Sequence, residues 1–287
     1  MPDNAYSPEY IVPVSSQRFV LLHYHIFKNA GSTIEYAMRR FFGNRFATLH
    51  GPDPDSILRG DDVAAFLVNH PKIAAISSHH VKYPKPAVAG VIVFDVCVLR
   101  DPLERLRSVY QHFQRSEPVD ELSARAKEMD LRSFLDLLIR QYPHMVNDAQ
   151  VNTLANAAAY TRPPDSTDLG EALRIVREMS VISVVDLFDE SLVAAEYFLC
   201  PAFPSIQLEY VSQNVSRKDA EPFRDAVGTT IYQQLEKMNH LDGELLSQAR
   251  AEVRRRFELV PDAQEKLAAF RRRCTGLEGA PPRVMAG

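Results

Sequence analysis

Residues 18–33 read RFVLLHYHIFKNAGST, and this stretch decides the fold class. Its first ten residues are mostly apolar, aromatic or β-branched, which is typical of a strand buried on both faces of a parallel sheet. The run ends at Lys28-Asn29-Ala30-Gly31, and Ser32 opens a helical pattern that extends to about Phe42. A buried strand, a short turn with a glycine and a helix that starts with Ser and Thr together predict an anion-binding unit.

Further strands and helices alternate after this unit, and we expect one α/β domain over residues 18–278. Strands alternating with helices predict a central parallel sheet covered by helices in three α/β/α layers, with a helical C-terminal half. An irregular arm (1–17) and a flexible tail (279–287) flank the domain. The other predicted strands are 73–78, 90–99 and 181–185; predicted helices are 32–42, 63–69, 103–115, 131–141, 148–160, 168–178, 190–198, 224–237 and 242–270.

The composition excludes several classes of protein. The 287 residues carry a net charge of −4, whereas a protein that binds nucleic acid through its phosphates is usually basic. The arginine runs 254–256 and 271–273 are therefore interpreted as solvated helix faces, and no nucleic-acid partner is expected. No run of about 20 apolar residues and no signal peptide is present. With three widely spaced cysteines, the chain is predicted to be a reduced, cytoplasmic protein; its oligomeric state stays open.

The turn at residues 28–33 is the first candidate binding element. Backbone N–H groups at a helix N-terminus bind oxyanions, and a glycine lets the backbone approach them closely. A Walker A loop places its lysine after the second glycine, whereas Lys28 precedes Gly31 here. An ordinary strand–helix turn remains the alternative. The residues predicted to bind the anion are Lys28, Asn29, Ala30, Gly31, Ser32 and Thr33.

The second element follows the strand predicted at 90–99. Arg100 stands at the strand end and Ser108 eight residues later on the next helix, with Asp101 as the expected helix cap. Arginine recognises phosphate through two parallel hydrogen bonds and serine adds a neutral donor. The alternative is that Arg100 only forms a local ion pair with Asp101 or Glu104.

A pair of histidines, His79-His80, follows the strand predicted at 73–78. In a parallel sheet ligands bind outside the carboxyl ends of the strands, so this pair is expected on the same edge as Lys28 and Arg100. An alcohol needs a base that is neutral near pH 7, and imidazole fits that requirement. Either histidine could instead be an ordinary polar loop residue.

Together these elements resemble the sulfotransferases that use 3′-phosphoadenosine-5′-phosphosulfate (PAPS), in particular the carbohydrate 2-O- and 4-O-sulfotransferase branch. Lys28-x-x-Gly31-Ser32-Thr33 is similar to the family's 5′-phosphosulfate loop, although the glycine stands one place later than is common. The run RDPxxRxxSxY from Arg100 is similar to its 3′-phosphate site. The resemblance implies that the three α/β/α layers form a P-loop-NTPase-like fold.

The resemblance also implies roles for particular residues. His80, in a His-Val-x-Tyr stretch, is implied as the catalytic base with His79 as second choice, and Lys28 as the residue that stabilises the leaving group. Asn214-Val215-Ser216 resembles a further family segment, and Arg217 is a candidate contact of the 3′-phosphate.

We therefore expect a sulfuryl transfer from PAPS to a hydroxyl of a glycan, small molecule or natural product, with adenosine 3′,5′-bisphosphate (PAP) as product. No metal is expected, because His23 and His25 lack a carboxylate or cysteine partner at metal-binding spacing. The alternatives are a P-loop kinase or nucleotide hydrolase, and a non-catalytic nucleotide-binding module. The sequence does not identify the acceptor.

Overall fold

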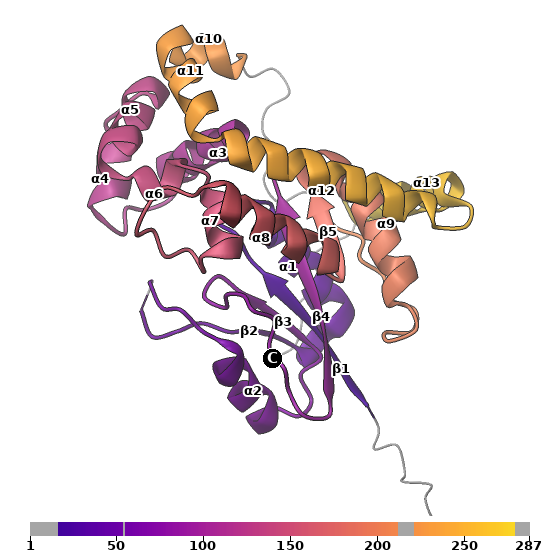
Figure 1. The fold of residues 1–287 in the computed structure, drawn as a ribbon. Helices are drawn as coiled ribbons and strands as arrows, with labels where there is room; N and C mark the ends of the chain where they lie inside the picture. The colour runs from indigo at the N-terminus through magenta and orange to yellow at the C-terminus, as the bar shows by residue number, and fades with distance from the viewer. Residues whose placement is uncertain (1–16, 54, 212–220, 279–287) are drawn as a thin grey trace, which may run out of the picture.

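The computed structural model describes residues 17–53, 55–211 and 221–278 (Figure 1). Almost all of the predicted arm, the predicted tail, Asn214–Ser216 and Arg217 lie outside these residues. Within the described residues, five parallel strands form one sheet in the order β2-β3-β1-β4-β5. The strands are β1 (Arg18–Tyr24), β2 (Phe46–Thr48), β3 (Ala75–Ser78), β4 (Val91–Leu99) and β5 (Val181–Val184). The predicted parallel α/β/α architecture is confirmed; the three-residue edge strand β2 was not predicted.

Helices cover both faces of the sheet because successive side chains of a strand point to opposite faces. In β1, Val20 and Leu22 belong to the hydrophobic core on one face, and Leu21 belongs to the core on the other. The first core packs against α2 (Gly60–Asn69), α7 (Ala149–Ala155), α8 (Ser166–Glu178) and α12 (His240–Glu258). The second packs against α1 (Gly31–Phe42), α9 (Phe188–Leu199) and α13 (Ala263–Glu278). This arrangement is the three-layer sandwich that a doubly buried strand requires.

A third hydrophobic core joins helices at one end of the molecule, at the upper left of Figure 1. Its centre includes Leu106 of α3 and Phe134 of α5, both fully buried. This group consists of α3 (Pro102–Arg115), α4 (Glu121–Lys127), α5 (Leu131–Gln141), α6 (Pro143–Val146), α10 (Phe223–Val227) and α11 (Thr229–Met238). Two 3₁₀ helices, η1 (Gly43–Arg45) and η2 (Val185–Leu187), complete the described elements.

Two predicted helices were too long, for reasons of backbone conformation. The helix expected over 242–270 is two helices, α12 and α13, separated near Pro261, and Asp262 has a φ of 53°. The helix expected over 148–160 ends at Ala155, and Ala157 and Ala158 have φ values of 53° and 63°. Positive φ is outside the α-helical region, so each segment must leave the helix there.

The strand–helix junction at Arg100 forms as predicted. The Asp101 carboxylate accepts hydrogen bonds from the N–H groups of Leu103 and Glu104, and Pro102 occupies the first helical position. An acidic cap satisfies orphan donors and a proline there loses no intrahelical bond. The start of α3 is thus fixed directly beside the strand end.

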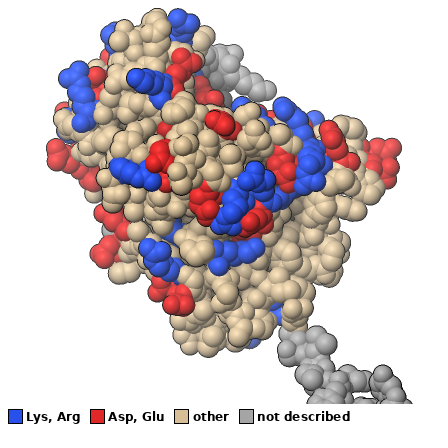
Figure 2. Space-filling model, in the orientation of Figure 1, with Lys and Arg blue, Asp and Glu red and all other residues tan. Residues whose placement is uncertain are grey.

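Charged side chains of both signs are interspersed on the face shown in Figure 2, which includes α8 and α12. Arg255 pairs with Glu252, and Arg271 pairs with Asp189. Arg256 differs from the solvated residue that the sequence predicted, since its guanidinium is mostly buried and donates to the carbonyl oxygens of residues 179 and 180. Among the described helices, none combines the length and the hydrophobicity that a bilayer span requires.

Candidate functional site

A cavity of about 710 Å³ lies at the carboxyl edge of the sheet. It brings together segments that follow four strands: the β1–α1 turn, the loop after β3, the β4–α3 junction and the segment after β5. Of the predicted site residues, the following line it: Lys28, Ala30, Gly31, Ser32, Thr33, His79, Arg100 and Ser108. Its volume falls within the usual range of small-molecule sites. Most of the predicted site residues therefore line the same cavity.

The turn before α1 has a backbone suited to an anion. Lys28 and Ala30 both have left-handed conformations, with φ values of 65° and 58°, on either side of Asn29. Left-handed residues in a turn direct successive N–H groups toward one point, and the first N–H groups of a helix have no intrahelical acceptor. The N–H groups of Asn29 and Thr33 donate to the carbonyl oxygens of Ile26 and Ala30, whereas α1 begins at Gly31, which lines the cavity together with Ser32.

Asn29 was predicted to contact the ligand, but the structure gives it a different place. Its side chain is buried, and Nδ2 donates to the carbonyl oxygen of Val98 at 2.9 Å and to Gln150 Oε1 at 2.7 Å. Gln150 Oε1 also accepts from the backbone N–H of Arg100 at 3.0 Å. Asn29 therefore anchors the turn to the strand end instead of lining the cavity.

Gly31 is required by its contact with His25, and not by its φ angle. A Cβ at this position would lie 1.9 Å from Cδ2 and from Nε2 of the His25 ring. Real Cβ atoms do not approach other heavy atoms so closely. The glycine therefore allows the imidazole to press against the turn, and His25 lines the same cavity.

Lys28 and Arg100 bring two positive charges to the cavity, which is also lined by Asp101, Glu104 and Asp186. Arg100 donates from Nη1 to the carbonyl oxygen of Lys28 at 3.2 Å, and both side chains are partly buried. Burial lowers the pKa of Lys28, and the neighbouring charges of Arg100 and Arg115 lower it further. Two cations that share a partly desolvated cavity favour an anionic ligand, which relieves their repulsion.

The structure separates the two predicted bases. His79 lines the cavity and stacks on His25, with ring centroids 3.7 Å apart. His80 is absent from the residues described as lining it, and its Nδ1 accepts a hydrogen bond from the Gly51 N–H at 2.7 Å. The two side chains diverge because they follow one another in a bend after β3. The geometry presents His79 and His25 to the cavity, and the assignment of His80 as the base stays a prediction.

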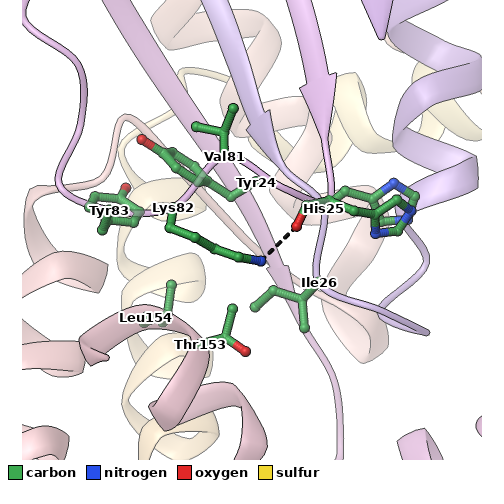
Figure 3. Close-up of a pocket in the computed structure, with 9 residues that line it drawn as sticks. Tyr24, His25, Ile26, Val81, Lys82, Tyr83, Thr153 and Leu154 are labelled. Atoms are coloured by element: carbon green, nitrogen blue, oxygen red, sulfur yellow. Dashed lines mark hydrogen bonds between the residues drawn. The ribbon is translucent and has the colours of Figure 1, made fainter. Parts of the chain in front are cut away.

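Lys82 supports the backbone of His79 through a hydrogen bond. Figure 3 shows its side chain extending past Ile26 toward His25, and Nζ donates to the His79 carbonyl oxygen at 2.6 Å. Burial lowers the pKa of Lys82. This contact fixes the backbone that carries His79.

Glu35 was missed by the sequence reasoning, although it lies at the site. Its Oε1 is 3.1 Å from His25 Nδ1 and accepts from Ser77 Oγ at 2.7 Å; Ser77 Oγ in turn is 2.8 Å from His23 Nδ1. His23, His25 and Glu35 have their potential metal-ligand atoms within 4.8 Å of one another. The carboxylate that the sequence did not place beside the two histidines is therefore supplied from the second turn of α1.

The far wall of the cavity was also missed. It comes from Val185, Asp186, Phe188, Tyr210 and Arg250, which lie in three distant segments. Phe188 meets Tyr210 edge to face at 5.0 Å, and Arg250 pairs with Asp186 at 2.8 Å. No spacing in the sequence relates these residues, because only the packing of α9 and α12 beside β5 brings them together.

The comparisons with known proteins agree with this geometry. A family model described as the sulfotransferase family matches residues 14–247, which include every cavity segment except Arg250. The chain belongs to the sulfotransferase family. An uncharacterized protein of Archaeoglobus fulgidus is 23% identical over 241 residues, which cover 78% of this chain and 93% of the relative. The family membership confirms the recognition made from the motifs at residues 28–33 and 100–110.

Proposed function

We propose that this sulfotransferase moves a sulfuryl group from PAPS to a hydroxyl group of a glycan or small molecule. The observation that carries the proposal is that the Lys28 turn, Arg100 and Ser108 line one cavity. A nucleotide with a charged group at each end needs two anion sites within one compartment. The two sites are also coupled, since Arg100 donates to the Lys28 carbonyl oxygen.

The residues present fit such a donor. The turn and Lys28 would hold the 5′-phosphosulfate, and Arg100 with Ser108 would hold the 3′-phosphate through charge-assisted hydrogen bonds. Phe188 and Tyr210 on the far wall offer an aromatic edge-to-face pair for the base. Lys28 neutralises the phosphate oxygen as it takes up negative charge, and an imidazole at the cavity accepts the proton of the hydroxyl group.

A P-loop kinase or hydrolase is disfavoured by the placement of the acidic residues. Such an enzyme holds Mg²⁺ with an acidic side chain at a strand end. Asp95 lies within β4, where it accepts hydrogen bonds from Tyr83 and Ser180. At the cavity, Asp101 caps α3 and Asp186 pairs with Arg250. Each of these carboxylates is already engaged in the fold.

The test is transfer of ³⁵S from labelled PAPS to a panel of hydroxyl acceptors, with and without EDTA. We expect transfer that persists in EDTA. Lys28→Met should lower turnover by about 10²–10³-fold. Lys127→Met is the matched control, because Lys127 is exposed on α4 and contacts only the Gln114 carbonyl oxygen among its recorded hydrogen bonds.

The outcomes separate the three candidate functions. PAP binding without transfer to any acceptor would indicate a non-catalytic nucleotide-binding module. Activity that required Mg²⁺ and a nucleoside triphosphate would indicate a kinase or hydrolase. Near-normal turnover of Lys28→Met would contradict the role given to Lys28.

A further inference from the structure

His23 and His25 stand two residues apart at the carboxyl end of β1, so their side chains point to the same face of the sheet. Their rings stack, with centroids 5.0 Å apart and an angle of 25° between the ring planes. Glu35, in the second turn of α1, places Oε1 3.1 Å from His25 Nδ1. Two imidazoles and one carboxylate therefore converge from two regular elements of the fold.

The separations between these side chains suit a single metal ion. Ligand atoms at about 2.0–2.1 Å from a tetrahedral zinc ion lie about 3.3 Å from one another. The 3.1 Å between His25 Nδ1 and Glu35 Oε1 matches this spacing. The potential ligand atoms of His23, His25 and Glu35 all lie within 4.8 Å of one another, so the widest separation exceeds the ideal one by at most about 1.5 Å. Among the residues that the structure describes, no other three histidine, cysteine or acidic side chains are grouped so closely.

Neighbouring side chains hold the three residues in this arrangement. Ser77 is completely buried, its Oγ donates to Glu35 Oε1 at 2.7 Å, and the same oxygen lies 2.8 Å from His23 Nδ1. The His79 ring stacks on that of His25, with centroids 3.7 Å apart. In metal sites, hydrogen bonds from outside the ligand set orient the ligands and strengthen metal binding. These contacts therefore preorganise the three side chains, so that binding of an ion requires little rearrangement.

We propose that His23, His25 and Glu35 form a binding site for a divalent transition metal, and that Zn²⁺ is the ion that fits it. Two imidazoles and a carboxylate are a ligand set that zinc uses, with a fourth position left for water. Mg²⁺ and Ca²⁺ instead prefer oxygen ligands throughout. The ion can enter from the cavity, because His25 lines it and the side chains of His25 and Glu35 are 11% and 23% exposed. The site is separate from the proposed sulfuryl transfer, in which the metal takes no step.

Metal binding is tested on the full chain, purified without a histidine tag and freed of metal with EDTA that is then removed. Titration calorimetry with Zn²⁺ should show one ion bound per chain. The Tm should rise by about 5 °C at about a hundredfold excess of Zn²⁺ over Kd, because the ion binds only the folded protein tightly. Co²⁺ in place of Zn²⁺ should give a ligand-field absorption in the visible range, which reports the coordination directly. Mg²⁺ should produce none of these effects.

Two conservative variants distinguish this site from the other histidines of the chain. Glu35→Gln keeps an oxygen that accepts from Ser77 but removes the charged ligand, and His23→Asn keeps an N–H for the contact with Ser77 but removes the imidazole. We expect each to weaken Zn²⁺ binding by at least about 10²-fold, since even the loss of an outer hydrogen bond costs about 10–100-fold. His70→Asn is the matched control, because His70 is exposed and its ring contacts only the Phe66 carbonyl oxygen among its recorded hydrogen bonds. Circular dichroism checks that each variant folds.

The outcomes distinguish the metal site from the proposed function. A wild-type chain that bound no Zn²⁺ would overturn the inference. Equal Zn²⁺ affinity in the wild type, Glu35→Gln and His23→Asn would also overturn it, because the ion would then be bound elsewhere; so would loss of binding in His70→Asn. None of these results touches sulfuryl transfer, which is measured with PAPS in EDTA. Conversely, a chain that bound Zn²⁺ at this site but neither bound PAP nor transferred sulfate would overturn the function and leave the metal site intact.

Discussion

Gln150 Oε1 lies 2.7 Å from Asn29 Nδ2, and this contact ties α7 to the turn before α1. The same oxygen accepts from the Arg100 N–H, and Gln150 Nε2 donates to the Arg100 carbonyl oxygen. One buried amide therefore joins the two halves of the proposed nucleotide site. Its backbone N–H is in turn held by Asp242 of α12.

We expect Gln150→Leu to weaken both the fold and the site. The substitution leaves Asn29 Nδ2 and the Arg100 N–H without their buried acceptor, and each unsatisfied group costs about 1–3 kcal/mol. PAP affinity should fall at least tenfold because the turn and the strand end are no longer held together. Calorimetry and denaturant unfolding measure the two effects. Gln141→Leu, on the exposed end of α5, is the control; equal effects of the two variants would contradict the bridging role.

Gly31→Ala should be far more harmful than an alanine elsewhere in a helix. Its Cβ would overlap the His25 ring, so the imidazole must leave the turn and its contact with Glu35. We expect a loss of transfer of at least 10²-fold. Gly170→Ala in α8 is the matched comparison, because no atom lies within 4 Å of its Cβ position. That variant should keep full activity and gain about 0.5–1 kcal/mol of stability. An active Gly31→Ala enzyme would show that the close packing of His25 is dispensable.

Arg100→Gln should reduce the preference of the protein for PAP over AMP. PAP carries the 3′-phosphate that Arg100 is proposed to bind, whereas AMP lacks it. We expect PAP affinity to fall by about 10–100-fold, which corresponds to the loss of a charge-assisted contact, and AMP affinity to change by less than about threefold. Lys28→Met should weaken both ligands. Titration calorimetry measures both affinities. Equal losses of affinity for PAP and for AMP in Arg100→Gln would contradict a contact between Arg100 and the 3′-phosphate.

Asp148 should make the stability depend on pH. Burial, together with the neighbouring Asp242 carboxylate, raises the pKa of Asp148 to about 7. The folded protein thus retains a proton that the unfolded chain releases. The contribution of Asp148 to the free energy of unfolding is therefore complete below about pH 4 and is lost as the pH rises to about 7.

Asp148→Asn removes this penalty and suits the left-handed backbone at the position, where φ is 45°. Its amide oxygen still accepts from the Asp242 N–H. The variant should be more stable than the wild type by about 1–3 kcal/mol at pH 8, and the difference should shrink toward pH 5. Thermal unfolding at both pH values measures this. A difference that did not vary with pH would mean that Asp148 is ionised throughout.

The sequence predicted the elements whose patterns are local. Both buried strands that carry the site, β1 and β4, were recognised from their apolar runs, and the Asp101 cap from its place before Pro102. The three-residue strand β2 and the breaks at Ala157 and Asp262 were not, because so short a strand has no periodicity and neither alanine nor aspartate by itself signals a positive φ.

By itself, the sequence determined the turn at residues 28–33, the arginine at the end of β4 and the parallel sheet that places both on one edge, since each follows from adjacent residues. Only the tertiary structure decided which histidine reaches the cavity. His79 and His80 are neighbours in the chain, and the bend after β3 turns one ring onto His25 and the other onto Gly51. The place of Glu35 was also decided by the tertiary structure. The first turns of α1 pack against β1 and β3, so the Glu35 carboxylate contacts His25 and Ser77. No sequence spacing connects these three residues.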